Sequence, residues 1–133
     1  MLNKENNLDF ETKHLPINYD TLAPDRSEIR LLLTMRVGSI VHCTLPPHEI
    51  SVAVRHKTVE EVWYFIEGQG EVWRKQGKRE EVVEVKNGVC ITIPTGTHFQ
   101  FRNTGSEPLK FLITTMPPWP GENEAVRVKN HWK

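Results

Sequence analysis

Two stretches of the chain hold the residue types that could do chemistry. Residues 55–70 contain His56 and Glu61, and residues 88–103 contain His98. Imidazole and carboxylate groups can ligate a transition metal, and alternate residues of a strand face the same side. Apolar residues surround these polar ones, and glycines and a proline, which favour turns, interrupt the sequence. The two stretches therefore indicate a polar site inside a β structure.

The same stretches resemble the two sequence motifs of the cupin family. The resemblance extends over about residues 30–116. It implies an all-β fold, a cupin-type double-stranded β-helix or jelly-roll barrel with an N-terminal arm. It also implies that the mouth of the barrel is the small-molecule site. The framework residues that carry it are Gly68, Gly88, Pro94, Gly96 and Asn103, and the family pattern implies turn glycines with positive φ at Gly68 and Gly96.

The resemblance implies metal ligands in the first motif, and one of them is missing. Counted back from Gly68, Glu61 falls where the family has its ligand Glu, and His56 falls on the second His of the motif. The first His position falls on Val54, which cannot ligate. In the alternative register His56 is the first His and Thr58 is its partner, and Thr is a poor ligand for a first-row metal. Either register leaves one family histidine absent.

The second motif departs from the family by one residue. The family pattern places its His at Phe99, whereas His98 lies one position earlier. A slip of one residue reverses the face to which a side chain points. His98 therefore reaches the lumen only if the preceding turn is tighter or a bulge resets the phase. Otherwise Phe99 and Phe101 fill the lumen and Gln100 faces out.

Two hypotheses of function follow. In the first, His56, Glu61 and His98 hold a divalent transition metal, Fe, Mn, Ni or Zn, as a facial triad. The protein is then a metal-assisted oxygenase or isomerase acting on a small polar metabolite, with Glu61 as the catalytic proton-transfer group. In the alternative, no metal binds, and the protein is a non-catalytic module that holds a sugar or effector. The fold does not choose between them. The expected substrate-binding residues are Trp63, Gln100 and Phe101.

The elements that must position these residues are short strands. We expect an N-terminal arm over residues 1–27, the cupin barrel over 28–116 and a C-terminal extension over 117–133. Frequent turn signals between alternating apolar residues favour strands throughout the barrel. Gly68-Gln69-Gly70 and Gln76-Gly77-Lys78 are both expected to close hairpins or tight turns. The expected strands are 29–37, 39–45, 50–54, 62–66, 71–75, 81–86, 89–93, 99–102 and 109–115.

The composition of the chain disfavours some classes of binding partner. The 133 residues carry 17 basic and 17 acidic side chains, so no basic surplus favours nucleic acid or an anionic membrane. No apolar run approaches the length of about 18 residues of a membrane span. Cys43 and Cys90 lie far apart and match no paired motif, which favours reduced thiols and a cytoplasmic location. We expect a small-molecule ligand, and an arm-mediated two-fold homodimer because such assemblies are the commonest.

Overall fold

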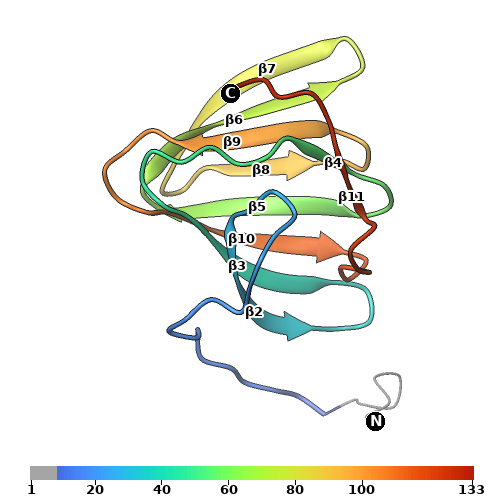
Figure 1. Ribbon diagram of the computed structural model, residues 1–133. Helices are drawn as coiled ribbons and strands as arrows, with labels where there is room; N and C mark the ends of the chain where they lie inside the picture. The colour runs from blue at the N-terminus through green and yellow to red at the C-terminus, as the bar shows by residue number, and fades with distance from the viewer. Residues whose placement is uncertain (1–8) are drawn as a thin grey trace.

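The computed structural model describes residues 9–133, and these residues form strands, turns and irregular segments without any helix. The expected all-β class is confirmed. Two sheets face each other, and neighbouring strands within each of them run antiparallel (Figure 1). The first sheet holds, in spatial order, β1 (Thr21–Leu22), β2 (Glu28–Thr34), β3 (Ser39–Leu45), β10 (Leu109–Met116), β5 (Glu60–Glu67) and β8 (Cys90–Ile93). The second holds β11 (Ala125–Arg127), β4 (Val54–His56), β9 (His98–Asn103), β6 (Gln69–Gln76) and β7 (Arg79–Lys86).

Aromatic side chains from both sheets fill the space between them. Alternation along β5 buries Trp63 and leaves Tyr64 exposed, because successive side chains of a strand point to opposite faces. The Trp63 ring contacts Phe99 and Phe101 of the opposite sheet and Phe111 of neighbouring β10, with ring centroids 4.9–5.3 Å apart. This packing fixes the phase of β5, and therefore of Glu61 two residues earlier.

The expected hairpin at Gly68-Gln69-Gly70 is wrong. β5 ends at Glu67 and β6 begins at Gln69, but the two strands belong to different sheets, so the chain crosses between sheets here. Gly68 has a φ of 81°, and a Cβ on it would lie 2.4 Å from the carbonyl oxygen of Pro108. The glycine therefore serves a close backbone approach at a corner. A two-stranded hairpin does form between β6 and β7, around Gly77.

The expected strand over residues 50–54 is mostly absent. Ile50 makes an isolated bridge to Arg102, and the strand proper begins only at Val54. Between them the Val52 amide donates to the Asp25 carbonyl, which attaches the segment leading into β4 to the end of the N-terminal arm. The Ser51 amide donates to the Phe101 carbonyl and the Phe101 amide donates to Ser51 Oγ, which attaches the segment to β9.

Residues 16–22 and the segment after β11 pack against the barrel. Arg30 of β2 donates to the carbonyls of Pro16 and Ile17, and β1 continues the first sheet. After β11 pairs with β4, the C-terminal segment crosses the second sheet toward β7 (Figure 1). Across residues 9–133 we find no helix long and apolar enough to span a membrane.

Candidate ligand-binding cavity

A cavity of about 530 Å³ opens between the two sheets. Apolar side chains of β2, β3, β4, β5, β9 and β10 line part of its wall. Residues 21–25 of the arm and the segment around Trp119 complete the wall, so both chain ends contribute to it. Mostly apolar concave sites with a few polar groups are the usual form of a small-molecule site. The polar groups of the wall include Asp25, Ser27, His56, Glu61 and Thr115.

Glu61 is a buried carboxyl group on the cavity wall. It is 6% exposed, and β5 places it opposite Thr115 of β10. Trp63 Nε1 donates to its Oε1 at 2.9 Å, and Thr115 Oγ1 donates to its Oε2 at 2.7 Å. Burial raises the pKa of Glu61 from 4.5 to about 7, although both hydrogen bonds lower it. Glu61 therefore changes protonation near neutral pH.

His56 lies beside Glu61 at the end of β4. Its Nδ1 is 3.9 Å from Glu61 Oε1, too far for a hydrogen bond, and this buried nitrogen has no partner among the described residues. The ring makes edge contacts with Phe99 and Trp119, each at a centroid distance of 5.1 Å. Burial lowers the pKa of His56 from 6.5 to about 4. The imidazole is therefore neutral at neutral pH.

Asp25 supplies a second buried carboxyl group to the cavity, from the arm. It is 8% exposed, and its Oδ1 accepts hydrogen bonds from the amide and hydroxyl of Ser27 at 3.0 and 2.6 Å. Burial raises the pKa of Asp25 above its ordinary value of 3.8 and outweighs these bonds. Its negative charge also raises the pKa of Glu61. Ionised Asp25 thus disfavours the ionised form of Glu61.

His98 lies away from this site. Phe99 is 1% exposed and lines the cavity, and His98, the preceding residue of β9, does not line it. Adjacent strand residues face opposite sides, so His98 points out of the barrel. There it pairs in register with Lys75, and its pKa is lowered by burial and by the charges of Lys75 and Arg55.

The three expected metal ligands are therefore not brought together. His56 and Glu61 share the cavity, whereas His98 lies on the other face of β9. Throughout residues 9–133 no group of three His, Cys, Asp or Glu side chains is placed to hold a metal ion. Two donors do not make the facial triad, so the residues here do not fit the metal centre that the resemblance implied.

Comparison with known proteins identifies the family. The family model Cupin_2, described as a cupin domain, matches residues 41–115, more than half of the chain. The chain is a cupin.

The similar proteins agree with this fold. This cupin is 31% identical over 123 residues to an uncharacterized protein of Methanocaldococcus jannaschii, covering 86% of this chain and 95% of that protein. A crystal structure from Bacillus halodurans is similar with a TM-score of 0.64 and 26% identity, over 74% of this chain and 76% of that one. A Klebsiella pneumoniae protein with a double-stranded β-helix domain has a TM-score of 0.66 and 19% identity, over 84% and 92% of the two chains. The expected double-stranded β-helix fold is thereby confirmed.

The expected substrate-binding residues of this cupin lie in three different places. Trp63 lines the cavity and is also packed in the aromatic core. Phe101 is fully buried in the aromatic core, without lining the cavity. Gln100 faces the outside of the second sheet, where its amide bonds to the backbone of His131 and Trp132 in the C-terminal segment. Gln100 therefore attaches the end of the chain.

Sequence reasoning missed most of the cavity wall, including Asp25, Thr115 and Trp119. Asp25 and Trp119 lie outside the family motifs, in segments whose packing no local pattern predicts. The sequence pattern could have predicted that Thr115 faces inward, because alternation along β10 places it on the same face as the buried Phe111 and Ile113. Its partner across the ladder, Glu61, is fixed only by the strand order β10–β5.

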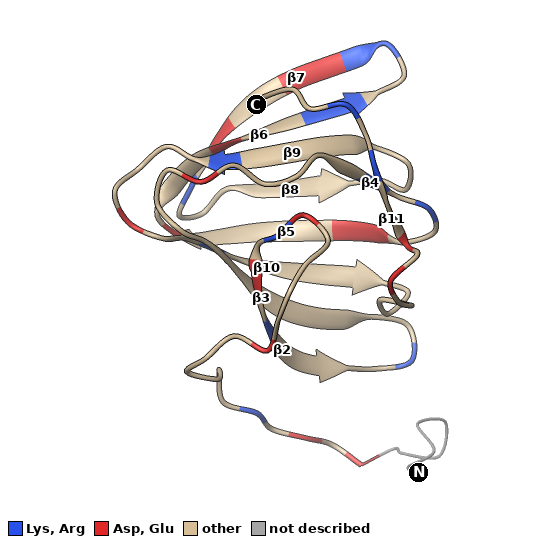
Figure 2. Ribbon diagram, viewed as in Figure 1, with Lys and Arg blue, Asp and Glu red and all other residues tan. Residues whose placement is uncertain are grey.

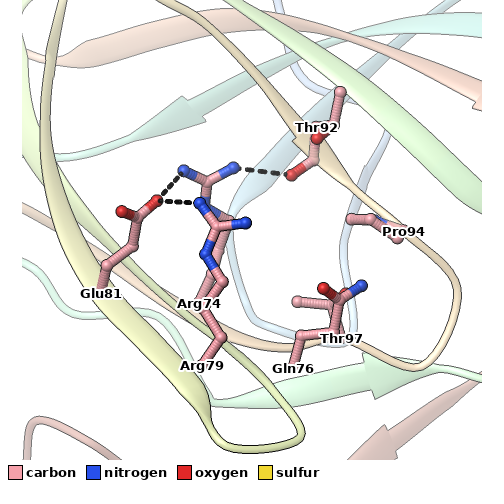
Figure 3. Close-up of a pocket in the computed structure, with 7 residues that line it drawn as sticks. All are labelled: Arg74, Gln76, Arg79, Glu81, Thr92, Pro94 and Thr97. Carbon is pink, nitrogen blue, oxygen red and sulfur yellow. Dashed lines mark hydrogen bonds and ion pairs between the residues drawn. The ribbon is translucent and has the colours of Figure 1, made fainter.

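A second, smaller hollow of about 140 Å³ lies at the β6–β7 hairpin (Figure 3). Arg74 donates to the Thr92 carbonyl and to Glu81 Oε1, both at 2.9 Å. Arg79 lies 4.0 Å from the same carboxylate oxygen. The two arginines of this hollow are therefore neutralised in part by Glu81, whereas no Lys or Arg of residues 9–133 lines the main cavity beside its acidic groups.

Proposed function

We propose that this cupin binds a small molecule in the main cavity through His56 and Glu61, without a metal held by His98. The observation that carries this proposal is the buried pair itself. Both side chains line a cavity of about 530 Å³, yet His56 Nδ1 and Glu61 Oε1 stay 3.9 Å apart and do not bond. Elsewhere in the barrel, buried Ser51 and Asn103 are hydrogen-bonded. His42 Nδ1, Arg74 Nε and Thr97 Oγ1 lack a partner within residues 9–133, as His56 Nδ1 does, but these three residues do not line the main cavity.

The energetics of burial support a binding role. Burying a polar group without a partner costs free energy, so an incompletely satisfied pair is costly unless it serves a function. Residues whose pKa is strongly perturbed in a concave site are candidates for function. Here the pKa of Glu61 is raised to about 7 and that of His56 is lowered to about 4. A ligand that bonds to either group would recover part of the burial cost.

A second candidate function is proton transfer to or from the bound molecule by Glu61. A general acid or base works best when its pKa lies near the working pH, and the pKa of Glu61 is about 7. This candidate keeps the expected catalytic role of Glu61 and needs no metal. Turnover of a bound ligand, lost in Glu61→Gln, would distinguish it from binding alone.

Metal retention tests the metal-free part of the proposal. We would incubate untagged protein with Fe, Mn, Ni or Zn salts in turn, dialyse it, and measure bound metal by elemental analysis. We expect less than one equivalent, and the same amount in His98→Ala, because His98 points away from the cavity. One equivalent of metal that is lost in His98→Ala would overturn the proposal and restore the metal-dependent hypothesis.

Ligand retention tests the binding part. Small molecules released by denaturing the purified protein would be compared by mass spectrometry between wild type, a His56→Phe/Glu61→Leu variant and the control Glu60→Gln, whose exposed side chain lies outside the cavity. Added fragments would be screened in the same three proteins. We expect ligands that wild type and the control hold and the double variant does not. Equal binding by all three proteins would contradict a role for the pair.

A further inference from the structure

We infer that the ligand of this cavity is a small organic cation, an amine with an apolar body. This inference rests on the proposed binding function and adds the class of ligand. Its first support is the charge of the wall. The ionisable side chains that line the cavity are three acids, Asp25, Glu61 and Glu122, and the neutral His56. Of the 125 residues from 9 to 133, no Lys or Arg lines it.

The two innermost acids lack a cation of the protein. Glu61 and Asp25 are each more than nine-tenths buried, and their hydrogen bonds come from Trp63, Thr115 and Ser27, all uncharged. Buried charges in proteins are normally paired. Figure 2 shows the acidic start of β5, whereas the β6–β7 hairpin carries basic residues beside acidic ones. The missing positive charge can therefore come from a ligand.

His56 independently indicates that a ligand binds here. It is 4% exposed and lines the cavity, and its Nδ1 is buried without a partner among the residues that the structure describes. Its neutral ring cannot supply the positive charge that Glu61 lacks. When a cation binds and Glu61 ionises, a small approach of the two side chains from 3.9 Å would let His56 Nδ1–H donate to Oε1. The orphaned nitrogen then gains a partner.

The hydrogen-bonding capacity of the wall matches an ammonium group. An ammonium nitrogen carries donors and no acceptor, whereas ionised carboxylates only accept. A carboxylate or phosphate ligand would instead meet further acceptors and like charge. The apolar body of the ligand would pack on the aromatic wall of Trp63, Phe99 and Trp119, and aromatic faces also attract cations.

Two matched ligand series test the inference: benzylamine, benzyl alcohol and benzoate, and n-butylamine, n-butanol and butyrate. Binding would be measured by calorimetry at pH 7.5 to the full chain. We expect each amine to bind at least about tenfold more tightly than its alcohol, because hydrogen bonds between charged groups are the stronger ones. We expect the two acids to bind more weakly than the alcohols.

Variants assign the effect to the acids. Glu61→Gln should weaken amine binding by at least about tenfold and by a clearly larger factor than it weakens alcohol binding, and Asp25→Asn should act in the same direction. Glu60→Gln is the control, and circular dichroism confirms that each variant folds. If one of the two acid variants does not fold, the amine affinity of the other tests the inference.

The possible failures are distinguishable. Alcohols that bind as tightly as the amines, or amine binding that neither acid variant weakens, would overturn the cation inference and leave the binding proposal standing. Tightest binding of the carboxylates would overturn the inference in the same way. No binding of any of the six compounds at millimolar concentration would overturn both.

Discussion

Thr115 lies directly across the β5–β10 ladder from Glu61, and its hydroxyl donates to Glu61 Oε2 at 2.7 Å. This bond favours the ionised carboxylate and lowers the pKa of Glu61, against the larger effect of burial. The ladder register therefore provides one of the two hydrogen bonds that limit how far burial raises the pKa of Glu61.

Removing this hydroxyl should raise the pKa of Glu61 further. We expect Thr115→Val to move it upward from about 7, because the carboxylate loses a donor while its burial is retained. The measurement is a pH titration of the Glu61 side-chain carboxyl by ¹³C NMR. Thr114→Val, one residue earlier on β10 and on its other face, is the control. An unchanged or lower pKa in Thr115→Val would show that the bond does not act on Glu61.

Glu61 should make the protein less stable as pH rises through neutrality. The folded protein holds its proton up to about pH 7, whereas the unfolded chain releases it near pH 4.5. The Glu61 contribution to the free energy of unfolding therefore falls between these pH values, by about 3 kcal/mol. His56 acts in the opposite direction between about pH 4 and pH 6.5, because the unfolded chain binds its proton first. The two contributions largely cancel from pH 4.5 to 6.5.

The variant Glu61→Gln isolates this contribution. Urea unfolding of wild type and variant from pH 4.5 to 7.5 gives the difference between their free energies of unfolding at each pH. We expect wild type to lose stability relative to the variant by about 3 kcal/mol over this range. The same comparison with Glu60→Gln should be flat, because this side chain is exposed. A flat difference for Glu61→Gln would mean that Glu61 ionises normally in the folded state.

Gly68 and Gly96 should respond very differently to an added methyl group. Both were expected to have positive φ, and their φ values are 81° and 84°. An alanine at Gly96 meets no described atom within 4 Å, so only the backbone strain of about 1 kcal/mol is expected. At Gly68 the Cβ would also lie 2.4 Å from the Pro108 carbonyl oxygen. Thermal and urea unfolding of Gly68→Ala should show a clearly larger loss, and equal losses would contradict the corner geometry.

The N-terminal arm still predicts a homodimer. Phe10 is 99% exposed and Ile17 is 90% exposed, which leaves two large apolar side chains on the arm in contact with solvent in the single chain. We expect a second copy to cover them, because two-fold homodimers are the commonest closed assembly. Sedimentation velocity at micromolar concentration should show a dimer for wild type and a monomer for Phe10→Ser/Ile17→Ser. A monomeric wild type would disprove the prediction.

The sequence predicted the fold well because its framework residues report local geometry. Alternation around Trp63 predicts the buried face of β5, and Gly96 predicts positive φ. Gly68 also has the expected φ, but a glycine with positive φ occurs both in hairpins and where a chain changes sheet. Only contact with Pro108, forty residues away, shows which one is present.

The site was less predictable because its wall depends on long-range packing. His56 and Glu61 fall within one motif, so the sequence could name them. Asp25 and Trp119 come from the two chain ends, and their approach depends on how those ends cross the barrel. The direction of His98 depends on the turn before β9, in which the Thr97 amide donates to the Pro94 carbonyl, and one residue of phase reverses it.

Histidine NMR tests the central claim, that the His56–Glu61 pair and not His98 forms the binding site. Ring ¹³C–¹H signals of all histidines, assigned by single substitutions, would be followed during titration with benzylamine and with benzyl alcohol. The account predicts that the His56 signal shifts saturably with at least one of the two compounds, while those of His98 and His48 stay in place. Saturable shifts of His98 with an unmoved His56 would contradict it.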